Sequence, residues 1–328
     1  MAIALVNSFI RNIKGRLKAL SPMICMPLLL LLIPTIRSYG QQDPGFTQYM
    51  YNTMLVNPAY TGSRDALNLL FMNRNQWVGF DGAPTTRSFA LHSPVFRNYV
   101  GLGLSYNRDQ IGPMNNESGA AYYAFRFRLH RTGFLALGLK TGFESWFFDH
   151  NALNPLNPDN TTYPSGQDRR TFISFGTGIF YHTQSFYLGL SSPDFHNLLL
   201  NIDSGSLGEQ HQKTEHYYLT SGYVADAGAY WKVKPSFLVR YVPDTPVSAD
   251  VNLNVMYAGT IVTGVSHRLG DSFGFMIHLR PFSQFWVGYA YDYGISGIAQ
   301  HNRGTHEIMI YFDLNRRKPE TIISPRFF

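Results

Sequence analysis

Two kinds of short motif in this sequence contain residue types that could perform catalysis or bind a cofactor. His306-Glu307 matches the start of the H-E-x-x-H motif, in which two histidines on one helical face bind zinc and the glutamate acts as general base. Ile310 stands where the second histidine would be, so the zinc site is incomplete. Gly101-Leu102-Gly103 and Gly176-Thr177-Gly178 lack the third glycine of a dinucleotide-binding turn, and closely packed strands explain them better. We therefore predict no catalytic residue, no metal site and no cofactor.

An enzyme whose catalytic residues come from distant parts of the chain is a weaker alternative, because the lack of a catalytic sequence motif does not exclude it. Ser266, His267 and His278 could meet as the nucleophile and base of a hydrolase. The only cysteine, Cys25, precedes an apolar run near the N-terminus, so the chain after that run offers no thiolate nucleophile, disulfide or cysteine metal site.

The first 40 residues have the composition of a signal peptide. They contain five of the 27 basic residues and none of the 21 acidic residues, and the apolar run 28–33 follows. This run is far shorter than the roughly 20 residues of a transmembrane helix. We predict cleavage near Gly40, although Met23 would serve equally well as the start codon. The remaining chain is close to neutral, which argues against nucleic-acid binding.

Apolar and polar residues alternate with a period of two along the rest of the chain. In 121–129, the odd positions carry Ala, Tyr, Phe, Phe and Leu, while the even positions carry Tyr, Ala and two arginines. The same pattern recurs in 250–257 and 307–313, and only a β-strand separates two faces in this way. Charged residues make up 15% of the chain against about a quarter in soluble domains. These features favour a membrane β-barrel over a soluble β-sandwich, in which alternation also occurs.

We predict a transmembrane antiparallel up-and-down barrel of about 14 strands over 67–313. The predicted strand centres are Leu70, Ala90, Leu104, Phe125, Leu139, Gly176, Tyr187, Thr220, Leu238, Leu253, Val265, Phe275, Gly288 and Ile310.

The connections between these strands alternate in length, which gives the barrel an orientation in the outer membrane. Longer connections, at 76–84, 109–116, 149–170 and 191–215, alternate with shorter ones, and long connections of such barrels face the outside. Both termini of the mature chain would then be periplasmic. The connections 149–170 and 191–215 are either solvated loops or contact sites for a secreted partner.

Charged residues of both signs are predicted on the inner face of the strands. Such a lumen is typically hydrated or crossed by salt bridges, and a selectivity filter is the alternative. The predicted lumen-facing polar residues are Arg126, Arg128, Arg240, Asp250, Asp292 and Glu307.

Two segments do not follow the strand pattern. In the predicted N-terminal segment 41–66, Phe46, Tyr49, Met50 and Met54 form one stripe of a short helix, which Asn57-Pro58 would end. This helix could plug the lumen or lie at the periplasmic rim. The predicted C-terminal tail 314–328 is basic and contains proline, and such termini are commonly loosely ordered.

A series of short motifs runs along the chain after Gly40. They are DPGFTQYM at 43–50, NPAYTGS at 57–63, RNQWVGFDGAPT at 74–85, HSP at 92–94, GLGLS at 101–105, IGP at 111–113, KPSFLVRY at 234–241, GYAYDY at 288–293, HEI at 306–308 and SPRFF at 324–328. With these motifs, the mature chain resembles the PorP/SprF family of the type IX secretion (gliding-motility) apparatus of Bacteroidetes. The resemblance extends over essentially the whole mature chain, and the combination of motifs is specific although no single motif is.

The resemblance implies a non-enzymatic outer-membrane barrel of the type IX system. Family members resemble partners of the periplasmic ring, or of secreted adhesins whose C-terminal sorting domains they help to export and hold at the surface. It also suggests that the segment 46–60 and the tail face the periplasm, where ring subunits could dock. The candidate partner contacts are Phe46, Tyr49, Asn57, Pro58, Tyr60, Arg316, Arg317, Arg326, Phe327 and Phe328. A general porin or a transporter of hydrophobic compounds is the alternative function.

Overall fold

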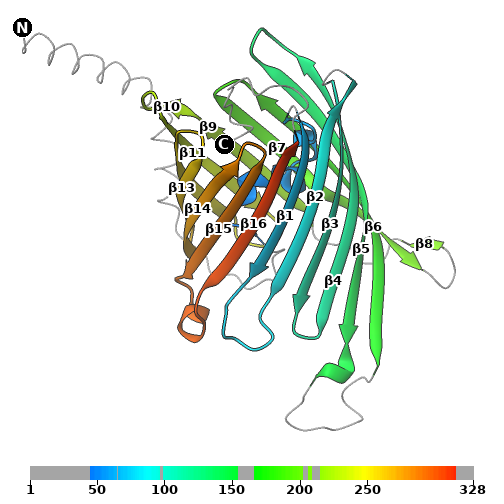
Figure 1. Cartoon of the computed structure of the whole chain (residues 1–328). Helices are drawn as coiled ribbons and strands as arrows, with labels where there is room; N and C mark the ends of the chain where they lie inside the picture. Colours follow the sequence, from blue (N-terminus) through cyan, green and yellow to red (C-terminus); the bar gives the residue numbers. More distant parts are fainter. Residues whose placement is uncertain are drawn as a thin grey trace, which may run out of the picture. The chain divides into compact units, whose positions relative to one another are not determined.

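The alternating segments form fourteen antiparallel strands that close into a barrel (Figure 1). The structure is a computed structural model, and it describes residues 45–64, 66–96, 99–153, 166–201, 206–208 and 215–314. The last strand pairs with the first, β16 with β1, and β9 joins β7 to β11, so the ring of strands has no open edge along most of its height. This arrangement confirms the predicted barrel and excludes the β-sandwich.

The strands vary from 8 to 16 residues, and the longest ones lie side by side. Two short strands extend the wall: β8 pairs with the end of β7, and β10 pairs with the start of β11. The strands are β1 (Leu67–Asn75), β2 (Thr85–Val95), β3 (Val100–Ile111), β4 (Met114–Arg128), β5 (Phe134–Asp149), β6 (Gln167–His182), β7 (Phe186–Asn201), β8 (Ser206–Gly208), β9 (His216–Tyr223), β10 (Ala225–Asp226), β11 (Trp231–Tyr241), β12 (Ser248–Tyr257), β13 (Ile261–Arg268), β14 (Ser272–Phe282), β15 (Phe285–Gly294) and β16 (Thr305–Leu314).

The two rims of the barrel differ in the length of their connections. The longest connections, 76–84, 150–166, 202–215 and 295–304, share one rim, which we call the loop rim, and two of them contain single-turn helices, η4 (His150–Ala152) and η5 (Gly297–His301). The opposite rim, which we call the turn rim, carries the connections 96–99, 129–133, 183–185, 224–230, 258–260 and 283–284. β16 ends at the turn rim.

All fourteen predicted strand centres lie inside strands, but some predicted connections were wrong in extent. The segment predicted as the loop 109–116 is a tight hairpin, in which β3 and β4 pair up to Ile111 and Met114 around Gly112-Pro113. Part of the loop predicted at 191–215 is strand, because β7 continues to Asn201 in register with β6. Neither strand end alternates in the sequence: 109–116 is polar at both ends, and 191–201 has a polar run followed by three consecutive leucines, so the pattern on which the prediction depended is missing.

The two faces of the wall have opposite character. Outward side chains are exposed and mostly apolar or aromatic, as in Leu102, Leu104 and Phe125, whereas the inward neighbours Tyr122 and Ala124 are buried. An exposed apolar outer band is the surface that a bilayer requires of a barrel. No helix among the described residues is long and apolar enough to cross a membrane.

Candidate functional site: the N-terminal segment inside the lumen

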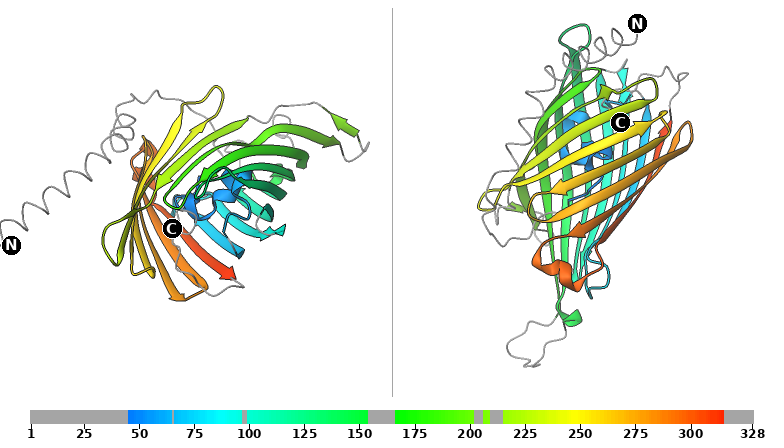
Figure 2. Two further views of the ribbon diagram at one scale, coloured as in Figure 1. Left: turned by 90° about the horizontal axis from the view of Figure 1, so that it is seen from above. Right: turned by 90° about the vertical axis from the view of Figure 1, so that its left-hand side faces the viewer.

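Residues 45–64, which we call the lumen segment, lie inside the barrel (Figure 2). In place of the short helix predicted from the stripe at 46–54, the segment contains two single turns, η1 (Tyr49–Tyr51) and α2 (Thr53–Val56), and a third turn, η2 (Pro58–Tyr60), follows Asn57. Asn57 interrupts the helix because it is extended before a proline, and its side-chain oxygen accepts a hydrogen bond from the Ala59 N–H at 3.0 Å. The segment therefore follows the lumen as a series of turns.

The lumen segment contacts the wall around most of its circumference. Asn57 Nδ2 donates to the Ile179 carbonyl of β6 at 3.0 Å, and Ser191 Oγ of β7 donates to the Val56 carbonyl at 2.8 Å. Asn252 Nδ2 of β12, farther around the ring, donates to the Tyr49 hydroxyl at 3.0 Å. Across the barrel from β6, the Thr47 hydroxyl donates to the Asp292 carboxylate of β15. These contacts span the lumen, so the segment occupies its cross-section.

Glycines on the wall make room for the backbone of the lumen segment. A Cβ on Gly101 of β3 would overlap the carbonyl oxygen of Thr61, and a Cβ on Gly138 of β5 would overlap the backbone nitrogen of Ala59. Close approach of another backbone is a recognised reason for glycine in a strand. Further wall glycines whose Cβ would meet the segment are Gly103, Gly178, Gly189, Gly274 and Gly288.

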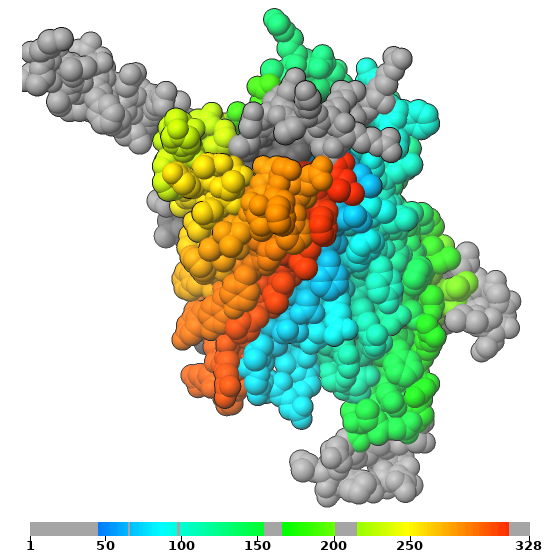
Figure 3. All heavy atoms as spheres, in the orientation of Figure 1, coloured from blue at the N-terminus to red at the C-terminus, as the bar shows by residue number. Residues whose placement is uncertain are grey.

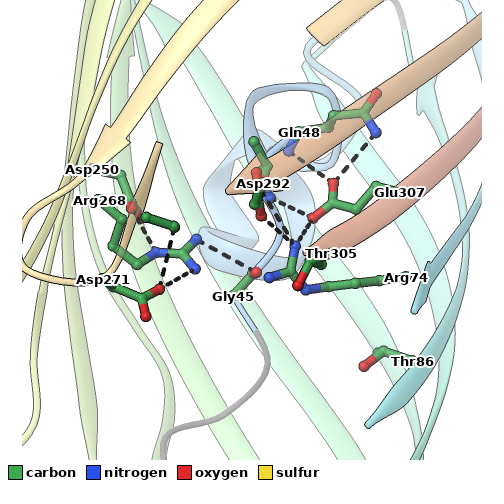
Figure 4. A network of polar contacts seen from close by, with 12 residues as sticks. Gly45, Gln48, Arg74, Thr86, Asp250, Arg268, Asp271, Asp292, Thr305 and Glu307 are labelled. Atoms are coloured by element: carbon green, nitrogen blue, oxygen red, sulfur yellow. Dashed lines mark hydrogen bonds and ion pairs between the residues drawn. The ribbon is translucent and has the colours of Figure 1, made fainter. Parts of the chain in front are cut away.

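A buried ionic cluster binds the start of the lumen segment (Figure 4). Arg74 Nη1 of β1 pairs with Asp292 of β15 at 3.0 Å and with Glu307 of β16, and we call these three residues the Arg74 cluster. The Glu307 carboxylate also accepts the backbone N–H groups of Thr47 at 2.7 Å and Gln48 at 3.1 Å. Two acids face one arginine, and the two amides of the segment compensate the excess negative charge.

Three further hydrogen bonds hold the two ends of the segment. Near its start, the side-chain oxygen of Gln48 lies 2.6 Å from Nε2 of the buried His278 on β14. Near its end, the Gly62 N–H donates to Nδ1 of His92 on β2 at 3.2 Å, and Arg126 of β4 donates to the Gly62 carbonyl. His92 and Arg126 lie near the turn rim, so the segment ends where β1 begins.

The two described ends of the chain point toward opposite rims. Gly45 accepts a hydrogen bond from Arg268 Nη2 at 3.5 Å, and Arg268 is the last residue of β13 at the loop rim. Leu314 ends β16 at the turn rim. The expectation that both termini are periplasmic stays a prediction, because 41–44 and 315–328 lie outside the described residues.

Five of the six predicted lumen-facing residues are buried in the interior. Asp292 and Glu307 belong to the Arg74 cluster, Arg126 binds Gly62, and Asp250 pairs with Arg268 Nε at 2.7 Å. Arg240 is buried, with its guanidinium carbon 5.8 Å from the centre of the Tyr218 ring. Arg128 is exposed near the turn rim, over the ring of Phe134 at 5.2 Å.

The predicted partner contacts in the N-terminal segment face the barrel. Tyr49, Asn57, Pro58 and Tyr60 are buried and Phe46 is half-buried, so a partner could reach them only if the lumen segment moved. Their role in partner contact stays a prediction. The predicted contacts in the tail, at 316, 317 and 326–328, lie outside the described residues.

The residues that sequence reasoning missed are those whose partners are distant in the chain. Arg74, Thr47, Gln48 and Arg268 were not singled out, although the position of Arg74 on the inward face with Leu70 and Met72 could have indicated it. A G-x-S-x-G pattern also occurs at 270–274, but it lies in the β13–β14 hairpin and not in a strand-to-helix turn. Its serine, Ser272, lies beside Asp271, and in the described chain no histidine contacts the hydroxyl.

A cavity remains between the lumen segment and the wall on the side of the loop rim. Its empty volume is about 1100 Å³, part of which is open to solvent. Phe46, Leu55 and Val56 of the segment face polar side chains of β3 to β7, including Lys140. Among the described residues, no group of three or more His, Asp or Glu side chains is arranged to hold a metal ion.

The solved structures that this chain resembles are outer-membrane barrels. The Ralstonia pickettii toluene transporter TbuX is 8% identical over 80% of this chain and 93% of its own, with a TM-score of 0.48. Acinetobacter baumannii Omp33 is 8% identical over 77% of this chain and 100% of its own, with a TM-score of 0.42. A Pseudomonas aeruginosa FadL homologue is 12% identical over 84% of this chain and 95% of its own, with a TM-score of 0.41.

At these identities the likeness is one of fold alone. No curated protein sequence matches the chain. The family model described as type IX secretion system membrane protein PorP/SprF matches residues 38–312, and this chain belongs to that family.

Proposed function

We propose that this chain is a non-enzymatic outer-membrane barrel that serves protein secretion by the type IX apparatus and does not conduct solutes. The observation that carries the proposal is the lumen segment, which contacts β6 and β7 on one side of the lumen and β15 and β16 on the other, and is held at both ends by buried contacts. A diffusion porin needs a water-filled channel through the barrel. The occupied lumen therefore supports the secretion role over the porin.

The partners that we propose are secreted adhesins with C-terminal sorting domains, components of the periplasmic ring, or both. Family membership supports an association with the secretion apparatus. The difference between the two rims supports an orientation in which the loop rim faces outside, because long connections of outer-membrane barrels do so. The turn rim and the C-terminal tail then face the periplasm and the ring.

Exchange of the outer connections tests the adhesin role. Replacing 150–166 by an inert loop of equal length should lower surface display of a candidate adhesin, and replacing the turn-rim connection 129–133 serves as the control. Immunofluorescence of intact cells measures the display. Normal display with the 150–166 replacement would refute adhesin contact at this rim.

Removal of the tail tests the ring role. A chain without 315–328 should lose co-purification with ring components while its barrel abundance is unchanged. If recovery of the ring is normal, docking through the tail is wrong. If the barrel itself disappears from the membrane, the tail serves insertion and the docking role is again contradicted.

A further inference from the structure

The outer face of β1, β2 and β3 changes from apolar to basic within one step along the strands. Phe71, Phe89 and Tyr106 are aligned across these strands and are 42%, 41% and 43% exposed. The next outward row toward the loop rim contains Asn73, Arg87 and Arg108. Because outward rows are about 7 Å apart, the edge of the apolar band lies between the two rows. Figure 3 shows this outer face of the barrel, with β16, β1 and β2 side by side.

Arg87 and Arg108 lie directly opposite each other on neighbouring strands. Both are exposed and point outward, since their neighbours Thr86 and Ser88 on β2 face the lumen and are buried. Like charges in directly opposed positions of a sheet destabilise it, because their Cβ atoms are only about 5 Å apart. This pair would therefore be stabilised by an anion that binds both guanidinium groups.

Among the described residues, acidic side chains neutralise the pair only in part. Arg87 has no hydrogen-bond or ion-pair partner within the part of the chain that the structure describes. Arg108 uses Nε for both of its contacts, a hydrogen bond to Asn115 Oδ1 at 3.1 Å and an ion pair with Glu117 at 3.6 Å. Two guanidinium groups thus face one half-exposed carboxylate, which leaves a positive charge at the edge of the apolar band.

Phosphate groups of membrane lipids are the anions found at this depth. The guanidinium group of arginine matches phosphate oxygens with two parallel hydrogen bonds, which a lysine cannot form. Aromatic side chains such as Phe89 and Tyr106 lie beside acyl chains at the same boundary. We propose that Arg87 and Arg108 form a binding site for the phosphate of a membrane lipid headgroup. The proposal requires only that the barrel lies in a membrane, and it is independent of the secretion partners.

Native mass spectrometry of the full chain in detergent tests this site. The probes are diphosphoryl lipid A, dephosphorylated lipid A, phosphatidylglycerol and inorganic phosphate. The variant Arg87→Gln/Arg108→Gln should bind the phosphorylated lipid on the order of tenfold more weakly than wild type, since loss of charge-assisted hydrogen bonds costs at least 1.4 kcal/mol. The matched control, Arg128→Gln/Arg131→Gln at the turn rim, removes the same charge and should bind like wild type.

The lipid probes identify the source of the phosphate. Preference for diphosphoryl lipid A assigns the site to lipopolysaccharide. Equal retention of phosphatidylglycerol assigns the site to phospholipids in general. Either result supports the proposal if the glutamine double variant no longer binds that lipid. Arg87→Lys/Arg108→Lys keeps the charge and should bind with intermediate affinity. Equal lipid binding by wild type and the glutamine variant would overturn the proposal. Binding of inorganic phosphate without any phosphorylated lipid would also overturn it.

Discussion

The Arg74 cluster links the lumen segment to the wall through single side chains. Arg74, Asp292 and Glu307 are 2%, 5% and 1% exposed, so each charge depends on its partners instead of on water. The alternation of apolar and polar residues along the sequence placed Asp292 and Glu307 on the inner face, because inward and outward side chains alternate strictly in a strand. Their pairing with Arg74 and Thr47 could not be predicted, because it joins residues more than 200 positions apart through closure of the barrel.

We predict that Glu307→Gln destabilises the folded barrel by about 3 kcal/mol, because it breaks a buried ion pair with Arg74 and replaces one of the two accepting oxygens by an NH2 group that cannot accept an amide N–H. The substitution preserves shape and removes the charge that accepts the Thr47 and Gln48 amides. The midpoint of urea unfolding of the refolded barrel measures the effect. Asp226→Asn, which alters the exposed pair with Lys232, should cost less than about 1 kcal/mol. Equal midpoints for the two variants would show that the Arg74 cluster does not stabilise the barrel.

The strands were predictable as elements, whereas the path of the lumen segment was not. Period-two alternation identifies a strand because one face meets lipid and the other meets the interior, and it located all fourteen strands. The helical stripe at Phe46 and Tyr49 indicated a non-strand element and left two positions open for it. Only the structure shows that the segment lies in the lumen, because the space for its backbone comes from glycines on different strands, such as Gly101 on β3 and Gly138 on β5. We call these wall glycines the glycine cradle. In the sequence, these glycines resemble ordinary strand glycines.

Filling the glycine cradle should displace the lumen segment. Gly138→Val places a branched side chain against the backbone of Ala59, which cannot shift without moving the whole turn η2. We expect a cysteine introduced as Thr61→Cys, at a position with 0% exposure, to resist maleimide labelling in the wild-type background and to be labelled with Gly138→Val. The matched control is Gly297→Val, because no atom lies within 4 Å of the added Cβ. Labelling that is unchanged by Gly138→Val would contradict the cradle.

Deleting one residue of the glycine-proline hairpin between β3 and β4 tests the corrected connection. Because Ile111 pairs directly with Met114, the loss of Gly112 removes a turn residue with φ of 51° and should disturb the register of both strands. A deletion in a true eight-residue loop would be tolerated. We therefore expect the ΔGly112 chain to lose heat-modifiable mobility on gels, and normal mobility would favour the loop.

At the scale of the whole molecule, the wall and the lumen segment have separate roles. The outer band adapts the barrel to the membrane, and the lumen segment occupies part of the interior that a wall of fourteen strands encloses. The remaining cavity faces the loop rim and is lined by Phe46 and Leu55 of the segment itself. The proposed secretion role depends on this occupied lumen, and the porin remains the alternative that the conductance measurement decides.

Single-channel conductance in a planar bilayer tests the central claim most directly, with the full mature chain compared with a chain that lacks residues 45–64. The lumen segment of the full chain spans the barrel from the Arg74 cluster to Gly62, so we expect no steady conductance from the full chain and stable open channels from the shortened one. Steady conductance from the full chain, or an equal signal from both chains, would contradict the claim that the lumen segment closes the barrel.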